Sequence, residues 1–186
     1  MFALRPESPA LARHLVCLDL VRSEIQSDGL ERPGVDRRIE VCRRLLLHAR
    51  WRGWEITHVH PRSASRASRP VPGLEPLPSE RLVYRTGVSA FTNRAFSQAV
   101  KAAPEAELVI AGISLSSACL ATAVTAHDLG LAVALASDAV LGAPAWPIAE
   151  GDRSLRAVVA RFARIATADE LIEVRRSLRL VAGGVS

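Results

Sequence analysis

The feature that most constrains this chain is the alternation of short apolar runs with segments of helical periodicity. The predicted strands are residues 14–20, 54–60, 81–85, 107–113, 131–137 and, more briefly, 163–167. The predicted helices are 35–53, 92–103, 117–129, a segment around 155–162 and one from about 169. Runs that are apolar throughout are typical of parallel strands covered on both faces. The pattern predicts an α/β fold: a three-layer, doubly wound (Rossmann-like), mostly parallel sheet of about six strands, with helices on both faces.

A single domain is expected to span residues 1–186. The length suits one hydrophobic core, and the sequence shows no internal repeat and no second composition regime. Residues 61–79 are rich in proline, serine and arginine and have no periodicity. A loop of this length in a compact domain often forms a lid or a subunit contact.

The composition excludes several classes of protein. A hydrophobic content of 49% with a net charge of +5 excludes a disordered chain, and no apolar run approaches the ~20 residues that cross a bilayer. The first 15 residues lack the apolar core of a signal peptide, so a cytoplasmic protein is expected. Cys17, Cys42 and Cys119 are odd in number and form no CxxC spacing, which supports neither a disulfide framework nor a zinc site.

The basic residues do not predict nucleic-acid binding. Lys101 is the single lysine among 24 basic residues, and the arginines are spread along the chain among 19 acidic residues. A nucleic-acid surface needs clustered positive charge with aromatic stacking partners. The one dense stretch, Arg62, Arg66 and Arg69, lies in the loop rich in serine and proline.

Candidate functional residues follow from the predicted topology. In an open parallel sheet, ligands bind beyond the carboxyl ends of the strands, where the strand order reverses. The side chains and the turn that this rule selects are Asp19, His58, His60, Arg85, residues 112–119 and Asp138.

Asp19 and Arg85 are expected to form an ion pair at this edge. Each follows a buried strand, and a buried charge is costly without a partner. Arginine stays protonated, so Arg85 can orient and stabilise negative charge but cannot shuttle protons. A purely structural ion pair is the alternative.

The turn GISLSSACL at 112–120 is dense in small and hydroxyl residues and opens a helix. Backbone N–H groups at a helix N-terminus suit an anion or a developing oxyanion. Cys119 is either a thiolate activated by this position or an ordinary packed cysteine. His58 and His60 have no third metal ligand nearby in the sequence, and the GxGxxG and P-loop patterns are absent, so neither a metal nor a cofactor is expected.

These stretches together resemble the isochorismatase-like hydrolase superfamily, which includes nicotinamidases and other amidohydrolases. HLVCLDL resembles the first strand of that family, which ends in the catalytic aspartate, at Asp19. LEPLPSERLVYRTGVSAF, at 74–91, resembles the region in which a glutamate, a lysine and Ser-Ala-Phe follow one another. Residues 107–140 resemble the family's strand, nucleophile turn, helix and next strand.

The resemblance implies a hydrolase of a small molecule that is a homo-oligomer, a dimer or larger, with Asp19, Arg85 and Cys119 as candidate catalytic residues. The substrate-binding positions that it implies are Ser89, Phe91, Ser114, Leu115 and Ala118. It also implies a non-proline cis peptide between Ser114 and Leu115. The loop at 61–79, with Trp51 and Trp54 near it in sequence, offers contact material for the oligomer.

The sequence departs from the family at two positions that decide the chemistry. Arg85 stands at the lysine position, and Ala118 stands at the nucleophile position, six residues after Gly112. Cys119 is one residue later, and one step along a helix rotates a side chain by about 100°. Cys119 is therefore not expected to point where the nucleophile would. The Asp-x-His metal motif of nicotinamidases is missing.

Three functions remain open from the sequence. The first is a non-cysteine hydrolase in which Asp19, held by Arg85, protonates a vinyl ether or orients water, as in isochorismatases that carry a small residue at the nucleophile position. An arginine beside a carboxylate favours its ionised form, which argues against the acid role. The second is a cysteine amidohydrolase that uses Cys119 after a local shift of the turn. The third is a binding or assembly protein on a degenerate hydrolase fold.

Overall fold

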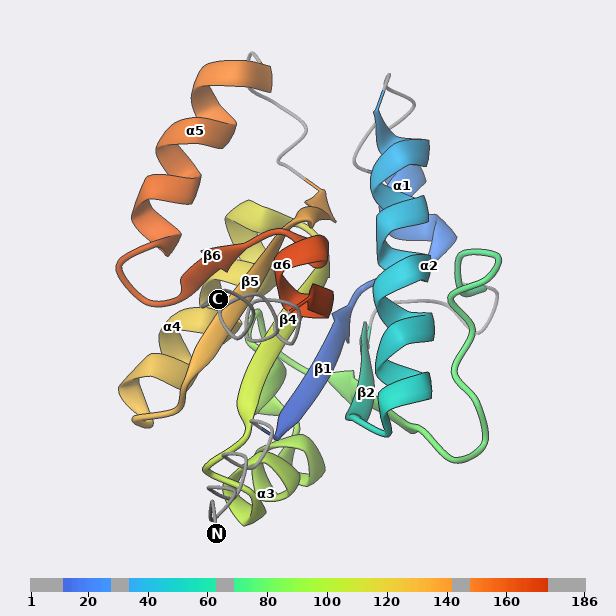
Figure 1. The fold of residues 1–186 in the computed structure, drawn as a ribbon, viewed down its shortest axis with the longest axis vertical. Coiled ribbons are helices and arrows are strands. Elements are labelled where there is room, and N and C mark those ends of the chain that lie inside the picture. The colour runs from blue at the N-terminus through green and yellow to red at the C-terminus, as the bar shows by residue number, and fades with distance from the viewer. Residues whose placement is uncertain (1–11, 28–33, 63–68, 142–147, 174–186) are drawn as a thin grey trace, which may run out of the picture.

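A computed structural model describes residues 12–27, 34–62, 69–141 and 148–173 of the chain (Figure 1). Its centre is one six-stranded sheet in which every neighbouring pair of strands is parallel. The strands are β1 (Arg13–Leu18), β2 (Glu55–Pro61), β3 (Arg81–Arg85), β4 (Glu107–Ile113), β5 (Val133–Leu141) and β6 (Arg164–Ala166). Their order across the sheet is β3-β2-β1-β4-β5-β6. The predicted α/β fold with a parallel sheet is thereby confirmed.

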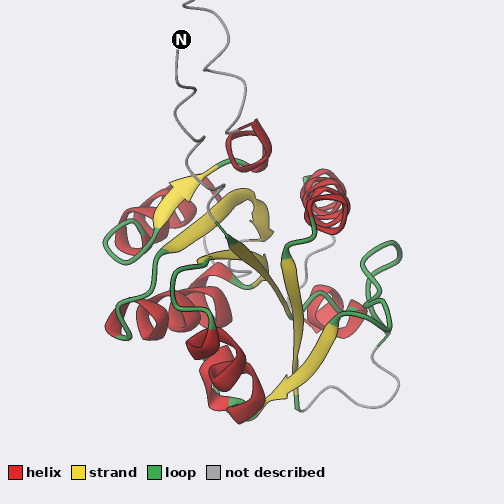
Figure 2. Cartoon of the chain, turned by 60° about the horizontal axis from the view of Figure 1, so that its bottom comes forward, coloured by secondary structure: helices red, strands yellow, loops and turns green. Residues whose placement is uncertain are grey.

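Helices cover both faces of the sheet, which makes three layers (Figure 2). The helical elements are α1 (Arg22–Ser27), α2 (Val35–Arg52), a 3₁₀ turn (Ala90–Thr92), α3 (Arg94–Ala102), a π turn (Leu115–Cys119), α4 (Leu120–Asp128), α5 (Ile148–Val159) and α6 (Ala168–Glu173). α2 and α6 pack side by side on one face, while α3 and α4 pack on the other. No helix among the described residues is both long enough and apolar enough to cross a membrane.

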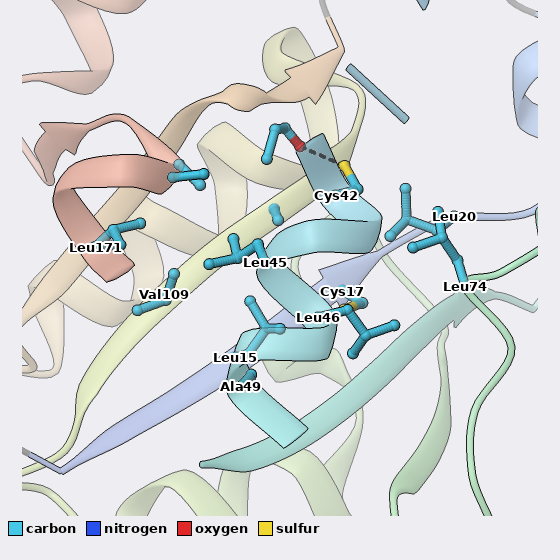
Figure 3. Packing of buried hydrophobic residues seen from close by; sticks show 14 of the residues in the cluster. Leu15, Cys17, Leu20, Cys42, Leu45, Leu46, Ala49, Leu74, Val109 and Leu171 are labelled. Atoms are coloured by element: carbon cyan, nitrogen blue, oxygen red, sulfur yellow. Dashed lines mark hydrogen bonds between the residues drawn. The ribbon is translucent and has the colours of Figure 1, made fainter. Parts of the chain in front are cut away.

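The two cores follow from the alternation of side chains along β1. Leu15 and Cys17 point into the core beneath α2, whereas Val16 and Leu18 point into the core beneath α3 and α4. Figure 3 shows the first of these cores, in which the thiol of Cys42 donates to the carbonyl oxygen of Ala139 at 3.1 Å. A buried polar group with such a partner avoids the cost of an unmade hydrogen bond.

The structure corrects the predicted ends of two elements. The fifth strand extends to Leu141, across a register shift against β4, so Asp138 lies inside β5 and does not follow it. The Asp138 carboxylate accepts a hydrogen bond from the amide of Ala168 at 2.7 Å and so caps α6. The helix predicted from 117 begins instead with the π turn, and Ser114 occupies its N-cap position.

The loop predicted over 61–79 is anchored where the structure describes it. Val71 and Leu74 are buried in the core beneath α2, and Pro70 forms an isolated antiparallel bridge with Val21. Residues 63–68, which include Arg66, lie outside the described residues. The second half of this loop is therefore part of the core that supports the edge of the sheet.

Candidate active site

The candidate active site lies where the strand order reverses, between β1 and β4. Crossovers run outward in opposite directions from these two strands, and in open parallel sheets ligands bind at such a point. Asp19 follows β1 directly, the π turn follows β4, and Arg85 ends β3. Asp19, Arg85 and the π turn therefore follow or end strands at the carboxyl edge of the sheet, where the sequence predicts the site.

The backbone of Asp19 has a left-handed conformation, with φ of 54°. Aspartate tolerates this region better than most residues with a side chain. The Asp19 amide donates to the carbonyl oxygen of Val59 at 2.8 Å, and its carbonyl oxygen accepts from the Val21 amide at 2.7 Å. These bonds fix the turn that ends β1, and the residue is 2% exposed.

Arg85 meets the Asp19 carboxylate with two nitrogens. Nε donates to Oδ1 at 3.1 Å and to Oδ2 at 3.2 Å, while Nη2 donates to Oδ2 at 2.6 Å. The Asp19 side chain is 3% exposed and that of Arg85 is 16% exposed. The predicted ion pair is confirmed, and its geometry is the two-pronged arrangement that a guanidinium makes with a carboxylate.

The position of Arg85 is set by its own backbone and by a third hydrogen bond. Its carbonyl oxygen accepts from the Arg62 amide at 3.0 Å, which continues the pairing of β2 with β3. Its Nη1 donates to the carbonyl oxygen of Gly87 at 2.7 Å. The guanidinium is thus held from two sides, and it stabilises negative charge at the end of β1.

The turn after β4 requires glycine at its start. Gly112 has φ of 142°, and a Cβ there would lie 2.0 Å from the carbonyl oxygen of Leu18. The carbonyl oxygen of Ser114 then accepts from the amides of Ser117, at 3.3 Å, and Cys119, at 3.2 Å. The last of these bonds spans five residues, so this helix opens with one residue more than an α-turn holds.

The cis peptide expected between Ser114 and Leu115 lies one bond earlier, between Ile113 and Ser114. The hydroxyl groups of Ser114 and Ser116 are 3.2 Å apart. Ser116 and Ser117 are exposed and Ser114 is half-buried, whereas Leu115 is buried. The turn therefore presents Ser116 and Ser117 to solvent, while Leu115 anchors it in the core.

Cys119 and Ala118 are both fully buried. Cys119 belongs to the apolar cluster that includes Val16, Leu18 and Phe96. Burial raises the pKa of its thiol well above the ordinary range. The charge of Asp19 raises this pKa further, and the charge of Arg85 lowers it. A thiol with a raised pKa is a poor nucleophile, because the thiolate is the reactive form. The environment is that of a packed cysteine.

The Ser-Ala-Phe segment lies beside the helix that follows the π turn. The Ala90 amide donates to the hydroxyl oxygen of the buried Thr122, at 3.0 Å, which joins this segment to α4. Ser89 accepts from the Phe91 amide at 3.3 Å, and the Phe91 ring packs against that of Phe96 with centroids 5.0 Å apart. Ser89 and Phe91 are each half-buried, so both are tied to the scaffold. Nothing in the sequence pattern indicated the role of Thr122.

The two histidines were predicted to follow the second strand, but that strand extends past both of them to Pro61. His58 and His60 are buried within the strand, where burial lowers the pKa of both, that of His60 to about 4. His58 Nε2 lies 2.9 Å from Oε2 of Glu80, and Arg50 Nε donates to the other carboxylate oxygen, Oε1, at 2.7 Å. The hydrogen bonds from Arg50, the Leu77 amide and His58 overcome the effect of burial and lower the pKa of Glu80 to about 2.

This network joins α2 to the segment that leads into β3, so it positions the strand that carries Arg85. Glu80 is the glutamate of the family-like region at 74–91, but the sequence gave no sign of its partners. Among the described residues, no group of three or more histidine, cysteine, aspartate and glutamate side chains is placed to hold a metal ion.

Comparison with known proteins gives one family and many similar structures. The family model for the isochorismatase domain matches residues 13–170. An isochorismatase from Pseudomonas putida KT2440 is 27% identical, with a TM-score of 0.75 over 89% of this chain and 94% of that one. No curated protein matches the chain.

Two more distant structures share the fold. An isochorismatase-like hydrolase from Alkaliphilus metalliredigens is 18% identical, with a TM-score of 0.71 over 87% of this chain and 97% of that one. A cysteine hydrolase from Pseudomonas syringae pv. phaseolicola 1448A is 15% identical, with a TM-score of 0.75 over 90% and 94%.

Proposed function

Because this chain belongs to the isochorismatase family, we propose that it hydrolyses a small molecule at the Asp19–Arg85 pair without a thiol nucleophile. The family resemblance inferred from the sequence is confirmed, and with it the hydrolase fold. The observation that carries the proposal is the paired carboxylate and guanidinium at the point where the strand order reverses.

In this proposal the Asp19 carboxylate accepts the proton of a water molecule. The water oxygen forms a bond to an electrophilic carbon of the substrate, the bond to the leaving group breaks, and the proton on Asp19 passes to the leaving group. The Arg85 guanidinium compensates the charge of the buried carboxylate, and this proposal assigns Asp19 the role of proton acceptor. The N–H groups at the start of the π turn lie at a helix N-terminus, where a developing negative charge is stabilised.

The environment of Cys119 argues against the cysteine amidohydrolase. Its sulfur lies in an apolar cluster and its thiol pKa is raised. A nucleophilic cysteine needs an exposed, electropositive surrounding that lowers this pKa. Ala118, at the family's nucleophile position, has no nucleophilic atom.

A binding protein without turnover is the second candidate, and one observation favours it. Both Asp19 oxygens receive hydrogen bonds from Arg85, and the carboxylate is almost wholly buried. This is also the geometry of a structural ion pair. The two candidates differ in whether substrate turnover depends on the carboxylate.

The test is a hydrolysis screen over isochorismate, small amides and carbamoyl compounds. We expect turnover by the parent chain, its loss in Asp19→Asn and its retention in Cys119→Ala. Turnover that survives in Asp19→Asn refutes the proposed mechanism, and turnover lost only in a folded Cys119→Ala supports the cysteine mechanism. Ligand binding without turnover, unaffected by Asp19→Asn, supports the binding protein.

A further inference from the structure

The segment that follows β3 folds back on itself and is held by one hydroxyl group. Thr92 ends the 3₁₀ turn, and its Oγ1 accepts hydrogen bonds from the amides of Gly87, at 3.0 Å, and Thr86, at 3.2 Å. The same hydroxyl donates to the carbonyl oxygen of Ser89 at 2.7 Å. One side chain therefore holds three backbone groups of the loop that comes directly after Arg85.

Gly87 leaves room for the methyl group of Thr92. A Cβ at position 87 would lie 2.8 Å from Cγ2 of Thr92, which is closer than carbon atoms pack. The hydroxyl group of Thr92 thus receives the Gly87 amide, while its methyl group fills the space that a side chain at 87 would need. A movement of the loop at Gly87 loses one or both of these contacts.

The carbonyl oxygen of Gly87 connects this loop to the candidate active site. It accepts from Nη1 of Arg85 at 2.7 Å, while Nε and Nη2 of the same guanidinium donate to the Asp19 carboxylate. An arginine side chain has much rotamer freedom to lose, so its direction depends on the groups that accept from its N–H donors. The end of β1 and the loop after β3 together hold the guanidinium of Arg85.

We propose that Thr92 is a positioning residue for the Asp19–Arg85 pair, an inference that rests on the function proposed above. Its hydroxyl group fixes the loop, the Gly87 carbonyl oxygen fixes the guanidinium, and the guanidinium orients the Asp19 carboxylate. Thr92 therefore acts through Gly87 and Arg85 rather than on the reacting atoms. A catalytic group works well only when its supports hold it close to the productive geometry, so loss of the Thr92 hydroxyl should slow the chemical step.

The first experiment separates the hydroxyl group of Thr92 from its methyl group. Thr92→Val keeps the shape of the side chain without the hydroxyl, whereas Thr92→Ser keeps the hydroxyl without the methyl. On a substrate found in the hydrolysis screen, we expect Thr92→Val to lower kcat about tenfold or more with little change in KM, and Thr92→Ser to keep kcat within about threefold of the parent. The matched control is Thr125→Val, which removes a hydroxyl that donates to the Ala121 carbonyl oxygen within α4 at 2.7 Å and should leave kcat unchanged.

The second experiment needs no turnover, so it decides the matter even if no compound in the screen is hydrolysed. Thr92→Val is made in the parent and in Arg85→Met, and the urea midpoints form a double-mutant cycle. A positioning role predicts that Thr92→Val shifts the midpoint in Arg85→Met by about half as much as in the parent, or less, because no guanidinium remains to be held. A role confined to the loop predicts equal shifts. If Arg85→Met does not fold, Asp19→Asn provides the second background, with the same expectation.

Equal midpoint shifts in the two backgrounds overturn the proposal, whether or not the chain hydrolyses a substrate. It is also overturned if a folded Thr92→Val keeps the kcat of the parent, or if Thr92→Ser is impaired as strongly as Thr92→Val. A parent without turnover whose midpoints are nevertheless coupled contradicts the proposed function and supports the positioning of Arg85 by Thr92. Circular dichroism of each variant confirms that it is folded, so a lost activity is not mistaken for unfolding.

Discussion

Removal of Arg85 should destabilise the fold far more than removal of Asp19. Arg85→Met takes away the guanidinium nitrogens that lie 2.6 to 3.2 Å from the carboxylate. The Asp19 side chain, which is 3% exposed, then keeps its charge in a buried position without this cation. Breaking a buried ion pair by removing one partner costs about 3–5 kcal/mol. We expect this loss for Arg85→Met.

Asp19→Asn leaves a different situation. Arg85 keeps its bond to the Gly87 carbonyl oxygen, and its side chain, 16% exposed, retains partial contact with water. The expected cost is about 1–3 kcal/mol, the range for a lost hydrogen bond to a charged group. The double variant Asp19→Asn/Arg85→Met buries no charge at this position, so its cost should fall well below the sum of the single variants, with a coupling energy of about 2–4 kcal/mol.

Urea unfolding followed by circular dichroism measures these differences. With a slope of about 2 kcal/mol per molar urea for a domain of this size, Arg85→Met should lower the midpoint by about 2 M. The slope should stay constant across the four proteins, which is the control for a common unfolded state. Additive single effects, or an Arg85→Met variant within about 1 kcal/mol of the parent, would refute the assignment of this pair as a coupled buried interaction.

Three further predictions concern the dependence of stability on pH, the turn after β4 and the hydrogen-bond network of Glu80. Burial lowers the pKa of His14 and His60 from the ordinary 6.5 to about 4, so between these pH values the unfolded chain binds more protons than the folded one. The free energy of unfolding should therefore fall by about 1–2 kcal/mol per histidine from pH 7 to pH 5. A His60→Asn variant whose urea midpoint depends on pH as strongly as that of the parent would contradict this. Gly112→Ala should lower the free energy of unfolding by more than about 4 kcal/mol or prevent folding, because the added Cβ meets a backbone oxygen. Gly130→Ala is the control: its Cβ meets no atom and only its φ is positive, so it should cost about 1 kcal/mol in thermal unfolding. Because the pKa of Glu80 is lowered to about 2, its carboxylate contributes to folding stability in full above about pH 4.5, and this contribution is lost as the pH falls through about 2. Glu80→Gln should therefore lower the free energy of unfolding by about 1–3 kcal/mol at pH 7 and by little at pH 2. Equal losses at the two pH values would be the contrary result.

The sequence could predict the sheet and the ion pair because both depend on local signals. Apolar runs without alternation indicate buried parallel strands. All five of the longer predicted strands are strands of the sheet, although Val83 is the one buried residue of the edge strand β3. Asp19 and Arg85 each end such a run, and parallel strands bring their carboxyl ends to the same edge. Two unlike charges at one buried edge leave few arrangements other than a pair.

The features that the sequence could not predict depend on contacts between distant segments. Asp138 looked like a residue beyond a strand, but the register shift extends β5 past it, and its carboxylate caps a helix 30 residues later. His58 is recognised as a structural residue only through Glu80 and Arg50, which come from other elements. The π turn, which adds a residue to the turn, has no composition signal that separates it from an ordinary helix start.

The unequal burial of Asp19 and Arg85 decides which substitution can test the proposed chemistry. Loss of activity in Arg85→Met has two explanations, since the variant both removes a charge from the site and destabilises the strand ends that build it. Asp19→Asn preserves the shape of the side chain, leaves Arg85 with its Gly87 partner and removes only the group proposed to accept a proton. An Asp19→Asn variant that is folded, binds substrate and does not turn it over therefore assigns the loss to the carboxylate. If the same variant loses binding and turnover together while its unfolding midpoint stays near that of the parent, the carboxylate acts in recognition, and the proton acceptor must be another group at this edge.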